Sequence, residues 1–386
     1  MNNFVFEYPT KVYFGNESAK EYLTQELAKV GTNVMLAYGG GSIKRNGIYE
    51  EFTSILEGSG KTVFEFSGIM SNPTYAKVLE GINLAKENDI DFILAVGGGS
   101  VIDCCKVVST GAKLDEDIWE FEYSKGGVPS EFIPMGAVVT AFGTGAEMNN
   151  GAVITNEEKM MKSPLWGAFY DFAILDPEYT MTMPMKQVIS GSFDTLSHCM
   201  ETYFGKPSDN NLSDDINEAV MRSVITNIRK TIANPEDREA RSELIWASAM
   251  GENGILKIGK ITDFQCHMLE HQLGAYTDCN HGQGLAVIHP VLYRHIYKEG
   301  VDRFARFASN VWNISEDGKT KEESALAGIE SLAEFIKEIG LPTSFGEMNI
   351  SDDIDLKAIA DSTMLMPGCC KQLDTEELLE ILEECM

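Results

Sequence analysis

The stretch Phe92-Ile-Leu-Ala-Val-Gly-Gly-Gly-Ser100 joins a short apolar run to three consecutive glycines. A short apolar run bounded by glycine is typical of a fully buried strand. Glycines between such a strand and a helix let backbone N–H groups approach a phosphate closely, and the dipole of the helix favours the negative charge. The stretch therefore predicts a strand, a phosphate-binding loop and a helix in succession, which is the repeating unit of a parallel α/β domain.

Two further loops have related features. Gly39-Gly-Gly-Ser42 follows another apolar run, and the polar loop Thr140-Ala-Phe-Gly-Thr-Gly-Ala-Glu-Met-Asn-Asn150 follows a third. Loops at strand ends are where α/β sheets bind ligands. After the central loop, Asp103 and Lys106 lie one helical turn apart. None of this matches the strict dinucleotide fingerprint, because Ile102 occupies the third glycine position, so a plain tight turn remains the alternative for both triple glycines.

The two halves of the chain differ in periodicity. Up to about residue 180, β-rich runs alternate with helical stretches, which predicts a Rossmann-like, mostly parallel sheet in residues 1–184. After Pro184 the β signal nearly disappears, which predicts an all-α domain in residues 185–386. The predicted strands are 11–15, 33–38, 62–66, 92–96, 132–140 and 172–177. The predicted helices of the second half are 185–204, 211–232, 236–258, 262–274, 284–297, 301–313, 320–339 and 374–385.

Composition excludes several classes of partner. Acidic residues outnumber basic ones 59 to 31, and the formal charge of −28 opposes binding to nucleic acid or anionic lipid. The longest apolar runs are far too short to span a bilayer. The eight cysteines form no CxxC motif, which favours reduced thiols. We therefore expect a soluble cytoplasmic protein, and a homodimer because dimers are the commonest closed assembly.

A carboxylate and several imidazoles lie at spacings that suit one metal ion. Asp194 and His198 are one turn apart on a predicted helix, and His267 and His271 repeat this i, i+4 arrangement before His281. Zinc and ferrous iron accept one carboxylate with two or three imidazoles, and a catalytic site keeps an open position. Each histidine taken alone is more often a packing residue, but four of the chain's six fall in this one pattern.

The remaining histidines and the neighbouring cysteines are interpreted differently. His289 and His295 share no helical face, so we interpret them as structural. Cys199 and Cys266 adjoin two of the candidate ligands, but sequence neighbours on a helix point about 100° apart. We expect both cysteines to be packing residues.

Together these motifs resemble one family. The segments Gly97-Gly-Gly-Ser-Val-Ile-Asp-Cys-Cys-Lys106 and Thr144-Gly-Ala-Glu147, with the pattern Asp-x3-His…His-x3-His-x9-His, are similar to the iron-containing (group III) alcohol dehydrogenases. The resemblance covers essentially the whole chain and is greatest to clostridial butanol dehydrogenases and NADPH-dependent aldehyde reductases. It implies a dehydroquinate synthase-like architecture. It also implies reversible hydride transfer between NADPH and short-chain aliphatic aldehydes such as butanal, in the cleft between the two domains.

The resemblance also implies roles for individual residues. One Fe²⁺ or Zn²⁺ ion would be held by Asp194, His198, His267 and His281, and His271 would line the substrate pocket. The cofactor diphosphate would lie on Gly97, Gly98, Gly99 and Ser100, and the nicotinamide half near Asp103, Thr140, Thr144, Asn149 and Lys162. The family often has serine where this chain has Ala146, so one hydroxyl is missing.

Cofactor choice is predicted from the first glycine loop. An acid after the strand that reaches the adenosine ribose favours NAD, because it bonds the 2′-hydroxyl and repels a 2′-phosphate. Here Ile43, Lys44 and Arg45 follow the loop, with no acid among them. We therefore expect NADP(H) to be preferred over NAD(H). The residues that would face the phosphate are Gly40, Gly41 and Ser42.

Three other functions remain open at this point. A metal- and NAD-dependent lyase of the dehydroquinate synthase kind would need a pocket rich in Lys and Arg, of which the helices around the candidate ligands offer few. A metallohydrolase with structural glycine turns would bind no nicotinamide. A nucleotide-binding regulatory protein would leave the ligand pattern without a purpose.

Overall fold

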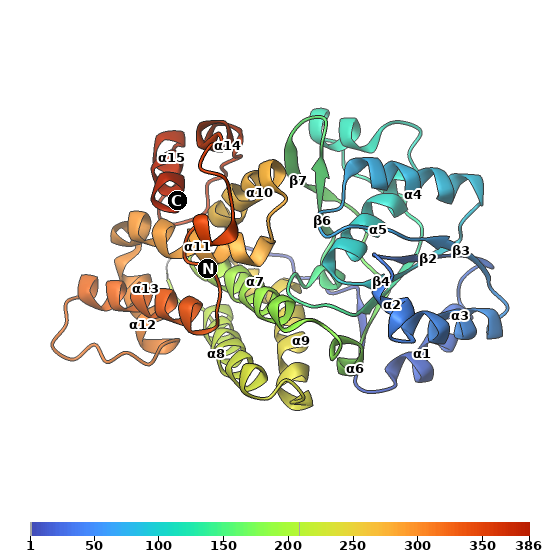
Figure 1. The fold of residues 1–386 in the computed structure, drawn as a ribbon, viewed down its shortest axis with the longest axis horizontal. Coiled ribbons are helices and arrows are strands. Elements are labelled where there is room, and N and C mark those ends of the chain that lie inside the picture. The colour runs from blue at the N-terminus through green and yellow to red at the C-terminus, as the bar shows by residue number, and fades with distance from the viewer. Residues whose placement is uncertain (1, 208) are drawn as a thin grey trace. The chain divides into compact units, whose positions relative to one another are not determined.

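The fold comprises two compact units. A computed structural model describes residues 2–207 and 209–386. The first unit, Tyr8–Pro184, contains the β-structure, and the second, Met185–Met386 together with the N-terminal residues through Glu7, is helical (Figure 1).

A six-stranded parallel sheet forms the centre of the first unit. Its spatial order is β1-β8-β5-β4-β2-β3, and every neighbouring pair is parallel. The fold confirms the predicted α/β class and each of the six predicted strands, three of them (β1, β5 and β8) shorter than predicted. The strands are β1 (Lys11–Phe14), β2 (Asn33–Tyr38), β3 (Thr62–Phe66), β4 (Phe92–Gly97), β5 (Met135–Val139) and β8 (Phe172–Leu175).

Helices α1 (Ser18–Leu27) and α3 (Ile48–Gly58) cover one face of this sheet (Figure 1). Leu23 of α1 and Phe52 of α3 are fully buried in one cluster with Leu94 of the central strand β4. Strand β4 is buried along its whole length, which explains its unbroken apolar sequence.

Helices α4 (Tyr75–Glu87) and α5 (Gly99–Gly111) lie on the other face (Figure 1). They pack closely because Gly81 has no side chain. A Cβ at Gly81 would lie 2.6 Å from a methyl group of Val108 and 2.8 Å from the ring of Phe66.

The order of the strands places both triple glycines at one point. The chain passes from β2 to β3 on one side and then returns to β4 on the other side, so the strand order reverses between β2 and β4. Tyr38 pairs with Val96 at the carboxyl ends of these strands. Gly39–Gly41 and Gly97–Gly99 therefore emerge side by side at the switch point, which is where open α/β sheets bind ligands.

An antiparallel hairpin was not predicted from the sequence. It is formed by β6 (Gly151–Asn156) and β7 (Met161–Trp166). Pro164 lies inside β7, and a proline within a short run argues against a strand unless the strand lies at an edge. Short helical segments complete the unit: α2 (Ser42–Arg45), a π-helical turn at Glu120–Ser124, a 3₁₀ turn at Ala146–Met148 and α6 (Pro177–Thr180).

The second unit is helical, as predicted. Four of the predicted helices, those that correspond to α9, α10, α11 and α12, differ from the observed bounds by three or more residues at one end or both, and α14 was not predicted. Helix α9 ends at Glu252 because Gly254 follows with φ +86°. Helix α11 begins at His281 because the Asn280 side chain accepts a hydrogen bond from Gln283 N. The helices are α7 (Met185–Tyr203), α8 (Leu212–Ala233), α9 (Arg238–Glu252), α10 (Gln265–Thr277), α11 (His281–Ile296), α12 (Val301–Asn310), α13 (Lys321–Glu338), α14 (Leu356–Ser362) and α15 (Thr375–Glu384), with 3₁₀ turns at Ile255–Lys257, Tyr297–Gly300 and Gly346–Met348.

The N-terminal residues pack with the helical unit, which strand and helix periodicity did not indicate. Asn2 N donates to Gly259 O at 3.2 Å. Phe6 lies against Gly254, 3.7 Å from where a Cβ would be. Throughout the described ranges, no helix combines the length and apolar composition that crossing a bilayer requires.

We predict that Leu94→Ala destabilises the protein far more than Phe14→Ala. Leu94 is fully buried in the central strand, whereas Phe14 lies on the edge strand and is 44% exposed. The first change should lower the free energy of unfolding by about 2–5 kcal/mol, because it leaves a cavity. The second should cost about 1 kcal/mol or less. Urea titrations followed by circular dichroism test this, and equal losses would contradict the assignment of β4 to the core.

Candidate functional site

Helix α7 places three polar side chains along one face. Asp194, His198 and Glu201 follow each other at i, i+4 and i+7. Asp194 is 4% exposed and Glu201 7% exposed, so two carboxylates are buried on one helix. The first two residues were predicted from the sequence. Glu201 was not singled out, although its spacing from Asp194 is a signal that could have found it.

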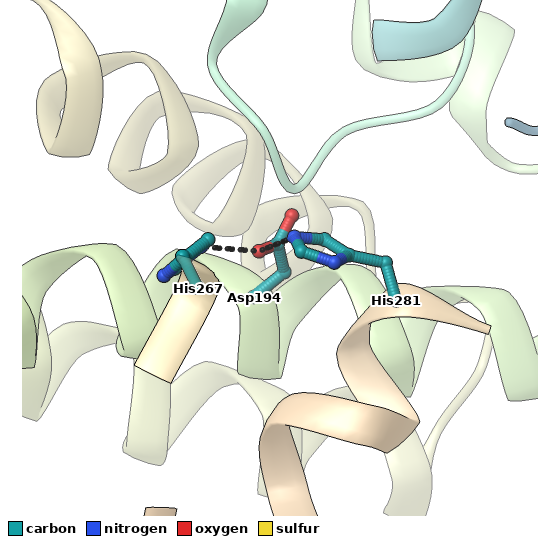
Figure 2. A group of neighbouring side chains, drawn as sticks. All are labelled: Asp194, His267 and His281. Atoms are coloured by element: carbon teal, nitrogen blue, oxygen red, sulfur yellow. Dashed lines mark ion pairs between the residues drawn. The ribbon is translucent and has the colours of Figure 1, made fainter. Parts of the chain in front are cut away.

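Helices α10 and α11 bring two imidazoles to Asp194 (Figure 2). Asp194 Oδ1 lies 3.6 Å from His267 Nε2 and 3.4 Å from His281 Nε2. Helix α11 approaches α7 closely because a Cβ at Gly282 would lie 2.3 Å from the carbonyl oxygen of Ser190. Asp194, His267 and His281 each offer one ligand atom, and these three atoms all lie within 4.8 Å of one another.

The geometry of this group fits a divalent metal ion. Asp194 Oδ1 and His267 Nε2 are buried, and neither has a hydrogen-bond partner within residues 2–207 and 209–386. Two ligand atoms about 2.1 Å from one tetrahedral ion lie about 3.4 Å apart. The separations of 3.4 and 3.6 Å are therefore long for hydrogen bonds but suitable for two ligands that share an ion.

The other two predicted histidines adjoin this group. His198 Nδ1 lies 2.9 Å from the carbonyl oxygen of Asp194, and its ring centre is 4.3 Å from that of His267. The ring of His271 is stacked 5.4 Å from that of His281. The structure thus brings all five predicted side chains together.

A second group of candidate ligands lies behind the first. Glu201, Cys266 and His289 also fit within 4.8 Å. Burial raises the pKa of Cys266 well above its usual value, which opposes the thiolate that a metal needs. His289 Nε2 is 2.6 Å from Ser197 Oγ, and burial lowers the pKa of His289 to about 3. Both residues are fully buried, as expected of packing residues.

The site carries an excess of negative charge. Burial alone would raise the pKa of Asp194, but the neighbouring imidazoles, His198 first, lower that pKa below its usual range. Burial alone would lower the pKa of His267, but Glu201 and Asp194 raise that pKa to about 10. In metal-free protein a proton on His267 therefore supplies the positive charge that a metal ion would bring.

The central glycine loop approaches the third loop without room for side chains. A Cβ at Gly99 would lie 2.3 Å from Thr144 Oγ1, and one at Gly98 would lie 2.9 Å from Ala141 Cβ. Helix α5 begins after Gly98 without a capping side chain in the described chain. Its first N–H groups are therefore oriented to bind an anion at the switch point.

Two predicted nicotinamide-side residues are tied to Lys106, which is fully buried. Lys106 Nζ donates to Asn149 Oδ1 at 3.0 Å and to Gly151 O at 2.6 Å. It lies 3.4 Å from Asp103 Oδ1, and Asp103 Oδ2 accepts from Val153 N at 3.0 Å. Asp103 and Asn149 thus hold the hairpin against α5. This role could not be predicted from the sequence, because the two residues lie far apart in the chain.

The remaining predicted cofactor residues lie on separate elements. Thr140 follows β5, and its N–H donates to Gly97 O at 2.9 Å. Lys162 lies on β7 opposite Thr155 and is buried. Ser100 lies in the first turn of α5, and its hydroxyl donates to Ser71 O.

The first glycine loop has an acidic neighbour that the sequence argument missed. Glu65 on β3 accepts hydrogen bonds from the hydroxyl of Tyr38 and, at 3.1 Å, from Lys44 Nζ. These hydrogen bonds, Tyr38 first, lower the pKa of Glu65 to about 2, so Glu65 is ionised. No acidic residue follows the loop directly in the sequence, but the neighbouring strand β3 places Glu65 close to it. Gly41 has φ +86°, and a Cβ at Gly40 would meet no atom within 4 Å.

One unit has a parallel sheet with glycine loops at its switch point, and the other gathers one carboxylate and several imidazoles. Together these features define a metal-dependent dehydrogenase with a dehydroquinate synthase-like fold. Residues 9–177 match the family model "Iron-containing alcohol dehydrogenase", and residues 188–386 match "Fe-containing alcohol dehydrogenase family, C-terminal". The chain belongs to the iron-containing alcohol dehydrogenase family, as the resemblance predicted.

Similar proteins cover the full chain. The probable NADH-dependent butanol dehydrogenase 1 of Bacillus subtilis (strain 168) is 40% identical over 388 residues, 99% of both chains. The NADPH-dependent aldehyde reductase of Escherichia coli (strain K12) is 34% identical over 354 residues, 91% of this chain and 90% of its own. The crystal structure of an NADH-dependent butanol dehydrogenase A from Thermotoga maritima superposes with a TM-score of 0.94 at 33% identity, covering 100% of this chain and 99% of its own. The chain is thus an oxidoreductase of the alcohol dehydrogenase type, and the lyase, hydrolase and non-catalytic alternatives are set aside.

We predict that zinc binding strengthens as pH rises. His267 must lose its proton before Nε2 can bind a metal, and its pKa in metal-free protein is raised to about 10. Each pH unit between about 6 and about 9 should therefore raise the affinity about tenfold. Competition titrations against a chromophoric chelator at several pH values measure this slope. An affinity that does not change with pH would contradict a metal bound through His267.

Proposed function

We propose that the protein is a metal-dependent alcohol dehydrogenase and aldehyde reductase that transfers hydride reversibly between NADPH and short-chain aliphatic aldehydes such as butanal. The observation that carries the proposal is the group of Asp194, His267 and His281, whose buried ligand atoms lie 3.4–3.6 Å apart in a chain of the iron-containing family. Relatives named butanol dehydrogenase and aldehyde reductase support the substrate class.

One divalent metal is held by Asp194, His198, His267 and His281. When bound, a divalent ion polarises a carbonyl oxygen as a Lewis acid. The chain's own part is to hold the Nε2 atoms of His267 and His281 toward Asp194. His271 lines the substrate pocket and exchanges a proton with the alcohol oxygen. The family name indicates iron, although the ligand set also suits Zn²⁺.

The nicotinamide cofactor is bound by the α/β domain, residues 1–184, and the metal by the helical domain, residues 185–386. Support comes from the glycine loops at the switch point and from the open first turn of α5, which suit a diphosphate. The contacting residues are Gly40, Gly41, Ser42, Gly97, Gly98, Gly99, Ser100, Asp103, Thr140, Thr144, Asn149 and Lys162.

NADPH is preferred over NADH. Relatives divide on this point, because four of the butanol dehydrogenases are named NADH-dependent, whereas the Escherichia coli reductase and one further butanol dehydrogenase are named NADPH-dependent. Support for NADPH comes from Lys44, whose ammonium group lies 3.1 Å from Glu65 and offsets its charge beside the loop. A 2′-phosphate would then meet a charge-compensated ion pair, in place of a bare carboxylate, together with the backbone N–H groups of Gly40 and Gly41.

The protein is a homodimer of a reducing, cytoplasmic compartment. Among the described residues none of the eight cysteines forms a disulfide bond, which suits such a compartment. The proposal of a dimer is based on the general prevalence of two-fold assemblies.

We predict that the purified, metal-loaded protein oxidises NADPH when butanal is added, with loss of absorbance at the reduced-nicotinamide band. A chelator should abolish the activity, and Fe²⁺ or Zn²⁺ should restore it. NADH should be oxidised more slowly under matched conditions. No oxidation of either cofactor with a range of aldehydes would overturn the proposed function, and a faster rate with NADH would overturn the cofactor preference alone.

We predict that Gly99→Ala weakens NADPH binding by about tenfold or more. The new methyl group would lie 2.3 Å from Thr144 Oγ1, so the first turn of α5 must shift away from the position that binds phosphate. The control is Gly58→Ala, where an added Cβ meets no atom within 4 Å. Quenching of tryptophan fluorescence by NADPH measures both affinities. Equal affinities in the two variants would exclude this loop as the diphosphate site.

A further inference from the structure

Two of the metal-facing imidazoles each lie between two carboxylates. Nε2 of His267 and of His281 faces Asp194, as described above. On the opposite side of each ring, Nδ1 contacts a second carboxylate, Glu201 for His267 and Glu270 for His281. Neither glutamate was predicted from the sequence to belong to the site.

These carboxylates select the tautomer of each ring. An ionised carboxylate only accepts hydrogen bonds, so the ring hydrogen must be on Nδ1. In a neutral imidazole this leaves the lone pair on Nε2, the atom that faces Asp194. His198 reaches the same state differently, because its Nδ1 contacts the carbonyl oxygen of Asp194 at 2.9 Å. The Nδ1 atom of His198 thus contacts a neutral carbonyl group, whereas the Nδ1 atoms of His267 and His281 contact carboxylates.

Glu201 is held in place by the start of α10. It accepts hydrogen bonds from Cys266 N at 2.8 Å and from His267 N at 3.1 Å, two N–H groups of the first helical turn. Phe264, the N-cap residue, has φ +50° and provides no capping side chain. The same carboxylate thus caps α10 and orients His267.

Glu270 is held in place by the start of α11. Its side chain is fully buried and passes beside Gly284, where a Cβ would lie 2.8 Å from Glu270 Cγ. Cys279 Sγ lies 3.7 Å from Glu270 Oε1. The glycine in the first turn of α11 therefore makes the space through which this carboxylate reaches His281.

We propose that Glu201 and Glu270 are positioning residues of the metal centre, which raise its affinity for a divalent cation by holding His267 and His281 in the tautomer whose Nε2 binds metal. The inference rests on the proposed metal function of Asp194 and the imidazoles. With Asp194, the two glutamates place three buried carboxylates around the site, and buried negative charge is strongly unfavourable unless a cation compensates it. A carboxylate behind a ligating imidazole also makes the ring a stronger donor, and its loss typically costs 10–100-fold in metal affinity.

Glu270→Gln is the decisive variant. Glutamine has nearly the same size and leaves no cavity, but it removes the charge and can present an N–H group to Nδ1, which favours the wrong tautomer. The dissociation constant for Zn²⁺, from chelator competition, should rise by about 10–100-fold. The visible absorption of the Co²⁺-loaded variant should shift in wavelength while keeping the intensity of the wild-type site, because the ligands remain and their donor strength falls.

Glu218→Gln is the matched control. Glu218 is a buried glutamate of the same unit, and it accepts a hydrogen bond from Tyr203 OH at 2.8 Å and forms an ion pair with Arg306. Its substitution should leave Zn²⁺ affinity and the Co²⁺ spectrum unchanged even if stability falls. Glu201→Gln should weaken Zn²⁺ binding and also lower the melting temperature of metal-free protein, because α10 loses part of its cap. If that variant does not fold, Glu270→Gln decides the matter alone.

The outcomes separate this inference from the function on which it rests. Wild-type protein that binds neither Zn²⁺ nor Co²⁺ would overturn the metal function and the inference with it. Wild-type protein that binds, with Glu270→Gln binding within about twofold of it, would overturn the inference alone. Glu270, His271 and His281 also fit within 4.8 Å, so Glu270 could itself be a ligand. A large change in the intensity of the Co²⁺ spectrum on substitution would indicate direct ligation and overturn the positioning role.

Discussion

The helical unit depends on burying negative charge between helices. Asp194 lies on α7 with less than a tenth of its surface exposed, and the imidazoles of α10 and α11 converge on one of its oxygens. A buried carboxylate is costly unless charges and hydrogen bonds compensate it. This requirement constrains three helices at once, because each must bring its histidine within a few ångströms of the same atom. Gly282 satisfies it for α11 by allowing close contact with Ser190 on α7.

The same groups that build the site also begin the helices. Glu201 caps α10 and contacts His267, and Asn280 caps α11 directly before His281. The first turn of each helix is therefore fixed relative to the imidazole that it carries. Because the orphan N–H groups of a helix start need acceptors in any case, a carboxylate placed there serves stability and the orientation of the ligand together.

The α/β unit obeys a different constraint, that of strand order. Two glycine loops separated by more than fifty residues become neighbours because the order of the sheet reverses between β2 and β4. The absent side chains of Gly98 and Gly99 then allow the loop after β5 to lie directly against them. Sequence periodicity predicted the strands and the glycine loops. It did not predict the hairpin β6–β7, because Pro164 interrupts its pattern, nor Glu65 beside Lys44, because that ion pair joins β3 to the short helix α2, which are far apart in the local sequence pattern.

The sequence by itself determined the class of each unit and the five polar residues of the candidate metal site, because apolar periodicity and i, i+4 spacing are local properties of a helix or strand. Glu201 could have been found in the same way, since it continues the face of Asp194 and His198. Only the tertiary structure decided that Glu270 contacts His281, that Lys106 holds Asp103 and Asn149, and that both glycine loops meet at one edge. These contacts join elements far apart in the chain, and their geometry depends on how helices and strands pack, which no local pattern of residues records.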